Sequence, residues 1–243
     1  MQPFYWRLVF RSNMNSMRAL WTILFFLFSG TLVFAQQTET RNLGSFKGVK
    51  AATGIDVYLK KGDRESARVE VSGTDVDNVI TEVSGDYLKI HMAEGRYNRT
   101  KTVKVYVTYV QLSKLSASSA ASIYGEGTIR TRSMEISASS AGSVEISIET
   151  EQLEVGVSSA ADVELTGKAK FAELEASSAG EIDAYDLEAE EVDANASSAG
   201  SIRVNVTQKI DARASSGADI RYRGSPMKTN TNSSSGGSVR KSS

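Results

Sequence analysis

The sequence predicts an all-β protein that folds as a parallel β-helix with coils of about 19 residues. A motif related to Ser-Ser-Ala-Gly returns seven times, apolar residues alternate with polar ones on both sides of it, and no mature segment has helical periodicity. Successive motifs lie 21, 19, 19, 20, 18 and 19 residues apart. Their first serines are Ser118, Ser139, Ser158, Ser177, Ser197, Ser215 and Ser234. A fixed period near twenty residues is typical of a solenoid.

The first 35 residues predict a signal peptide. Arg18 precedes an apolar stretch over residues 19–34, and Val33 and Ala35 are small residues at positions −3 and −1 of a cleavage site. A membrane anchor is the alternative, but the stretch is shorter than the roughly 20 residues that span a bilayer. We therefore expect cleavage after Ala35 and an exported protein without a transmembrane segment. The expected location is the periplasm, the outer membrane surface or the medium.

Composition excludes several classes of function. The formal net charge is −1, so no basic excess selects nucleic acid as a partner. The chain has one histidine, His91, and no cysteine. These counts argue against a Cys/His zinc site, a thiol nucleophile and a Ser-His-Asp triad. We expect no cofactor.

The mature chain divides into four parts. Residues 36–42 are expected to be a short linker, and residues 43–224 a single β-helix domain. Within it, 43–112 carries irregular N-terminal coils or a cap, and 113–224 carries the regular repeats. Strand patterns with period 2 recur in the cap, for instance Ile55, Val57 and Leu59. Residues 225–243 are either a degenerate last coil or a disordered tail.

The repeats align on the first serine of each motif. One apolar column stands three positions before it: Leu115, Ile136, Val155, Leu174, Ala194 and Ala212. Another stands five positions after it: Ile123, Val144, Val163, Ile182, Ile202, Ile220 and Val239. Such columns predict two inward-facing strand segments in each coil, joined by the Ser-Ser-Ala-Gly stretch as a corner. An antiparallel sandwich of hairpins is the competitor, but residues 113–224 lack the Asn-Gly or Asp-Gly turns that hairpins favour.

The corner residues suggest tight packing. We expect the third and fourth motif positions, such as Ala179 and Gly180, to face a crowded interior that admits only small side chains. We expect glycine to supply a positive φ at the bend, and serine hydroxyls to satisfy backbone groups there. On this interpretation Ala179→Leu would be severely destabilising.

Two outward columns are candidate sites. Four positions before the repeat serine stand Glu135, Glu154, Glu173, Asp193 and Asp211. This acidic column is either a solvated face or a ladder of oxygen ligands for a hard cation such as Ca²⁺. Six positions after the serine the column ends in Arg203, Arg221 and Arg240. This arginine stripe is either ordinary surface charge, with an Asp183–Arg203 pair, or a binding site for an anionic polymer.

The sequence resembles a known family through its N-terminal pattern and its repeats. Phe46, Ile55-Asp56-Val57 and Gly62 are followed by Leu88-Lys89-Ile90 and then by the repeated Leu/Ile-x-x-x-Ser-Ser-Ala-Gly-x-Ile/Val. This pattern, over residues 42–224, is similar to the head GIN domain family, labelled "putative auto-transporter adhesin", of Bacteroidetes-like bacteria. The resemblance implies an exported β-helical domain and brings no catalytic residues.

Two functions remain open from the sequence. The favoured one is a non-enzymatic exported scaffold or adhesion module whose candidate partners are a cell-surface glycan or protein. The alternative is a carbohydrate-active β-helix enzyme, a polysaccharide lyase or hydrolase. Asp162 and Glu181 would be neighbours on adjacent coils and are the only acid pair of interest for such chemistry. No long insertion builds the walls of a cleft, and the repeats have few aromatic residues for sugar stacking.

Overall fold

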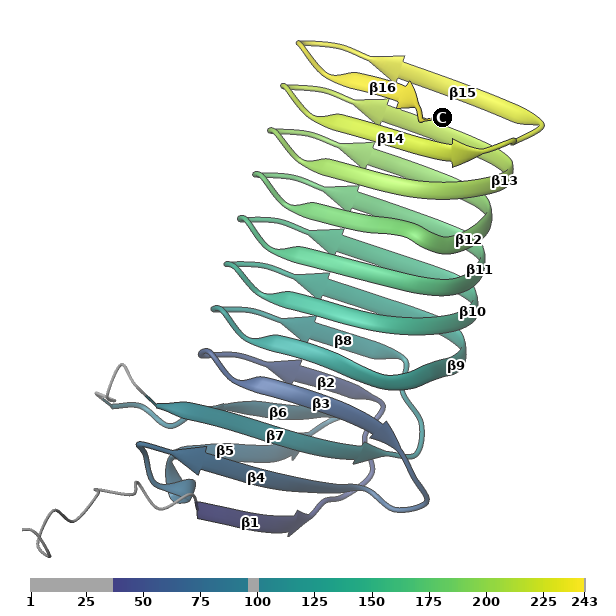
Figure 1. Ribbon diagram of the computed structural model, residues 1–243. Coiled ribbons are helices and arrows are strands. Elements are labelled where there is room, and N and C mark those ends of the chain that lie inside the picture. The colour runs from purple at the N-terminus through teal and green to yellow at the C-terminus, as the bar shows by residue number, and fades with distance from the viewer. Residues whose placement is uncertain (1–36, 96–100, 243) are drawn as a thin grey trace, which may run out of the picture. The chain divides into compact units, whose positions relative to one another are not determined.

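The structure is a computed structural model that describes residues 37–95 and 101–242 (Figure 1). Residues 36–243 form one compact unit. The expected signal peptide lies outside the described residues. Within the described part of the chain, no helix has the length and apolar character that crossing a membrane requires.

The regular part of the unit is a stack of long, bent, parallel strands (Figure 1). Each strand pairs with its equivalent in the next coil, as parallel β-helices require. The strands are β8 (Lys114–Ala117), β9 (Ser122–Ala138), β10 (Ser143–Val157), β11 (Asp162–Ala176), β12 (Glu181–Ala196), β13 (Ser201–Ala214), β14 (Asp219–Gly224), β15 (Lys228–Ser233) and β16 (Ser238–Lys241). The predicted fold class is confirmed.

Each coil has a Ser-Ser corner at one end and a wide bend at the other (Figure 1). We call the strand halves that lead into the corners, such as 152–157, the pre-corner face. The halves that follow the corners, such as 143–150, are the post-corner face. Both faces pair coil to coil from β9 to β13, and shifts in register interrupt the pairing on the post-corner face and at the bend.

Apolar side chains fill the space between the two faces. Both predicted inward columns are buried, apart from Val239 in the last coil, which is partly buried. Removal of this apolar surface from water is the main force that holds the coils together. Every buried side chain of the described residues is hydrophobic, so the interior offers no polar cavity.

The corners are tight turns with an unusual backbone. At the first regular corner Ser119 and Ala120 both have positive φ, 51° and 58°, and the Ala121 N–H donates to the Ser118 carbonyl at 3.1 Å. This pattern is that of a type I′ turn. The Ala120 N–H donates to the Ser140 carbonyl of the next coil at 3.1 Å. Backbone groups thus satisfy one another up the stack. The expected role of the serine hydroxyls is wrong, because no described hydrogen bond uses a hydroxyl of the paired corner serines.

Of the two corner positions that we expected to be packed, the fourth is buried and the third is not. Ala179 has a φ of 60° and is exposed, whereas Gly180 is buried with an ordinary backbone. A Cβ on Gly180 would lie 2.8 Å from the Val157 carbonyl oxygen of the preceding coil. Close approach, rather than positive φ, therefore explains this glycine. Among the Ser-Ser corners, glycine takes the positive-φ position only in the last two, at Gly217 and Gly236.

The N-terminal section starts the stack and covers its first end. β2 (Gly48–Ala51) and β3 (Asp56–Lys61) form a first coil, with a corner at Thr53 and Gly54 that also has positive φ. The face of β3 is extended by β7 (Thr102–Tyr109), β4 (Ser66–Ser72) and β1 (Gln37–Asn42), and the face of β2 by β6 (Tyr87–Met92) and β5 (Val79–Ser84). The short 3-10 helix η1 (Val76–Asn78) lies between β4 and β5.

Both ends of the unit form strands. The expected linker contributes β1, which pairs antiparallel with β4. Its residues are exposed or half-buried, so its sequence lacks the apolar alternation that marks the other strands. At the other end, residues 228–241 form a last coil from β15 and β16. The inward positions of β15 carry threonine and serine, and all six residues of this strand are exposed.

Candidate functional site

The acidic column occupies the pre-corner face in the predicted register. Glu135, Glu154, Glu173, Asp193 and Asp211 are direct neighbours on successive coils. Successive strands are about 4.8 Å apart, so these carboxylates form a continuous row. The row begins after Lys114, whose position in the register precedes Glu135.

The ends of the acidic column are neutralised and its middle is not. Lys114 Nζ lies 2.7 Å from Glu135, and this hydrogen bond raises the pKa of Lys114. At the other end Arg213 contacts Asp211 at 2.8 Å and Asp193 at 3.5 Å. Glu154 and Glu173 have no ion pair or hydrogen bond within the described residues.

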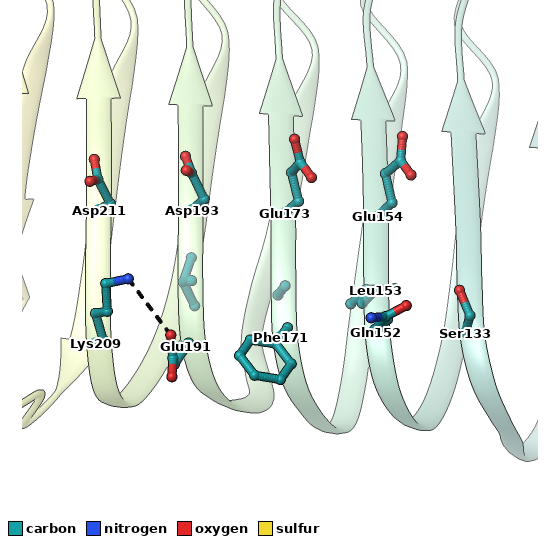
Figure 2. A pocket seen from close by; sticks show the side chains of 12 residues that line it. Ser133, Gln152, Leu153, Glu154, Phe171, Glu173, Glu191, Asp193, Lys209 and Asp211 are labelled. Carbon is teal, nitrogen blue, oxygen red and sulfur yellow. Dashed lines mark ion pairs between the residues drawn. The ribbon is translucent and has the colours of Figure 1, made fainter.

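A shallow hollow of about 420 Å³ lies over the middle of this column (Figure 2). Figure 2 shows Phe171 on the same side of the sheet as Glu173 and Glu154, nearer the wide bend. The Phe171 side chain is 51% exposed. Its column neighbours are Gln152 and Glu191, and Glu191 pairs with Lys209 at 3.7 Å. Five carboxylates and one ammonium group line the hollow, which makes it strongly acidic.

A second hollow of about 820 Å³ runs along the corner side of the same face. Its floor carries small residues, among them Ser137 and Gly156, and further along it Glu175, Asn195 and Arg213. It is a trough parallel to the acidic column, open along several coils, and it adds hydroxyl and amide groups to that face.

The arginine stripe is on the post-corner face, in the predicted register. Arg203 contacts Asp183 at 2.8 Å, as expected, and also Glu181 at 2.9 Å. The hydrogen bond that Arg203 donates to Asp183 raises the pKa of Arg203. Arg221 pairs with Asp219 at 2.7 Å. The stripe is therefore largely compensated by carboxylates on its own face, which weakens its case as a site for an anionic polymer.

Sequence analysis missed an aromatic stack in the same column. The Tyr58 ring stacks on Tyr106 and on Tyr124, with centroids 5.0 and 5.2 Å apart. The Arg68 guanidinium lies 4.1 Å from the centre of the Tyr106 ring. Burial raises the pKa of Tyr58. Tyr58 and Tyr124 stand the same number of residues after their corners. This equal spacing is the sequence signal that could have predicted their contact. The column continues into Glu145 and Glu164, which lack ion pairs among the described residues.

The remaining sequence candidates lack a catalytic arrangement. Asp162 and Glu181 are neighbours in register, but Asp162 accepts a hydrogen bond from Ser143 at 2.8 Å and Glu181 pairs with Arg203. His91 is half-buried on β6, and its Nδ1 lies 2.9 Å from the Met92 carbonyl oxygen. In residues 37–95 and 101–242, no three His, Asp or Glu side chains are grouped to hold one metal ion.

Comparison with known proteins identifies the family of this chain. The family described as "Putative auto-transporter adhesin, head GIN domain" matches residues 45–226, and the chain belongs to it. No curated protein matches the sequence.

Solved structures from Bacteroides and Parabacteroides species have the same architecture. A crystal structure of a "putative adhesin" from Bacteroides fragilis is 22% identical, with a TM-score of 0.79, and the match covers 86% of this chain and 97% of that one. A "putative lipid binding protein" from Parabacteroides distasonis is 21% identical, with a TM-score of 0.68 and the same coverage. A "putative adhesin" from Parabacteroides merdae is 16% identical, with a TM-score of 0.65, over 86% and 96%. These likenesses show the shared fold.

Proposed function

We propose that the protein is an exported, non-enzymatic adhesion module that binds its partner on the flat pre-corner face. The observation that carries this proposal is the regularity of that face. Outward residues stand in straight columns across the successive coils from β9 to β13. Such a surface presents many equivalent contacts to an extended partner at a fixed spacing. The adhesin family supports the same function, and the signal-peptide pattern supports export.

The chemistry of the described side chains fits binding better than turnover. Glycosidic hydrolysis needs one carboxylic acid and one carboxylate on opposite sides of the scissile bond. Asp162 and Glu181 instead lie side by side on one open strand face, and Glu181 is already paired with an arginine. An enzyme on this scaffold would need functional loops around its site. The corners and bends between the regular strands are short.

Incubation of the purified protein with anionic and neutral polysaccharides tests the proposal. We expect no release of reducing ends or unsaturated uronates. We also expect protein-coated beads to be retained on one immobilised glycan or protein surface. Heat-unfolded protein on identical beads is the control. Release of either product in proportion to protein concentration would instead establish the carbohydrate-active enzyme.

A further inference from the structure

The only large apolar side chain exposed on the regular coils from β9 to β13 is Phe171. The other outward residues of its column in these coils are polar or charged: Ser133, Gln152, Glu191 and Lys209. Its ring has no stacking or cation contact among the described residues. The tyrosines of the post-corner face are different, because they cover one another by stacking. An aromatic face thus stays available to a ligand at Phe171.

The two unpaired carboxylates of the acidic column lie beside this ring. Glu173 follows Phe171 by two residues on the same face of β11, and Glu154 is the register partner of Glu173 on β10. Figure 2 shows both carboxylates on the same side of the sheet as the ring. The cations of the same surface, Lys209 and Arg213, are engaged by Glu191 and by Asp193 and Asp211. Negative charge therefore remains uncompensated where the aromatic surface is exposed.

We propose that this part of the pre-corner face binds a lysine- or arginine-bearing segment of a partner protein. One cationic side chain would lie over the Phe171 ring, which attracts cations through its quadrupole, and would hydrogen-bond to Glu154 and Glu173. The inference rests on the proposed function, because it names the partner class of the same face.

Binding of a fluorescent oligolysine peptide to the purified protein tests the inference. The double variant Glu154→Gln/Glu173→Gln should weaken binding about tenfold, since each exposed ion pair contributes a few-fold. Phe171→Gln, which copies the neighbouring Gln152, should weaken it about threefold. Rising salt should weaken binding to the parent. Urea unfolding of each variant verifies that the fold is kept.

The matched control is Glu145→Gln/Glu164→Gln. These residues are exposed glutamates on the same two strands, also without ion pairs, but on the post-corner face. The control removes the same charge and should change peptide affinity less than twofold. Equal weakening by both double variants would mean attraction to net charge alone and would overturn the inference. Self-association that Phe171→Gln abolishes would also overturn it, because a second copy would then occupy the face.

The bead assay separates this inference from the proposed function. If the peptide fails to bind while protein-coated beads still adhere to a glycan or protein surface, the cationic partner is wrong and the adhesion function stands. If beads adhere to no surface, the adhesion function itself fails.

Discussion

The left-handed backbone of the corners predicts that a glycine substitution there stabilises the protein, although such a substitution usually destabilises. Ala179 stands at the tip of a type I′ turn with a φ of 60°, and its methyl group is exposed. A left-handed backbone costs a residue with a Cβ roughly 1–2 kcal/mol. Glycine avoids this cost but loses about 0.5–1 kcal/mol more backbone entropy on folding. Ala179→Gly should therefore raise the free energy of unfolding by about 0.5–1 kcal/mol.

The same change at Ala194 is the control. Ala194 is fully buried on an inward position of β12, with an extended backbone. Ala194→Gly adds the entropy cost without relieving strain and removes one buried methyl group, worth about 0.8 kcal/mol. It should lower the free energy of unfolding by about 1.5 kcal/mol. The two variants have identical composition, so only the local backbone and burial can separate them.

Urea unfolding followed by circular dichroism measures both variants against the parent. Solenoids can unfold in parts, so coincident transitions at two wavelengths are required before free energies are compared. Opposite shifts of the two midpoints are expected. If Ala179→Gly were destabilising by as much as Ala194→Gly, the corners would not be left-handed turns and the corner geometry would be refuted.

The buried glycine column, the acidic column and Tyr109 each give a further test. Gly180→Leu should destabilise by about 3 kcal/mol or more and Ala179→Leu by less than about 1, because only the first side chain would clash with backbone; equal effects in thermal melts would contradict this. Glu173→Gln should be neutral or stabilising by up to about 1 kcal/mol, since it removes repulsion from Glu154. A melting temperature that rises several degrees with millimolar Ca²⁺ in the parent, but not in Glu173→Gln, would show instead a cation site. Burial raises the pKa of Tyr109, so the unfolded chain ionises first and stability should fall as pH rises past about 10. Tyr109→Phe should flatten that alkaline fall, and an unchanged slope would disprove the assignment.

The fold and the column register followed from the sequence because one rule governs both. Parallel pairing places residues with equal offsets from the corner beside one another, so aligning the motifs also aligns the columns. The coils range in length from 18 to 21 residues, yet the acidic residues, such as Glu154 and Glu173, are in register. The differences are absorbed by irregularities on the post-corner side and at the bend, as between Glu164 and Thr166. The pre-corner segments therefore keep their offsets.

The sequence did not predict which corner residue faces the interior, nor did it predict the aromatic stack, for two different physical reasons. The third and fourth motif positions are alanine or glycine in most coils, so no contrast in polarity and little in size marks which of the two points inward. The turn also breaks the period-2 alternation on which inward assignments depend. The Tyr58–Tyr106 contact joins β3 to β7, which are distant in sequence and lie outside the regular repeats. No period links them, so only the folded chain brings them together.

Folding requirements account for the inward residues and the corners but not for the middle of the pre-corner face. The coils are held by buried apolar columns and by backbone hydrogen bonds, and neither depends on the outward residues. The chain neutralises acidic residues elsewhere on this face, with Lys114 at one end and Arg213 at the other. It covers outward aromatics elsewhere too, by stacking Tyr124 on Tyr58. Within the described residues, Glu154 and Glu173 are not neutralised and Phe171 is not covered by another ring. The adjacent like charges of the two glutamates cost stability. The proposed binding of a cationic partner would give these three residues a purpose that the fold alone does not.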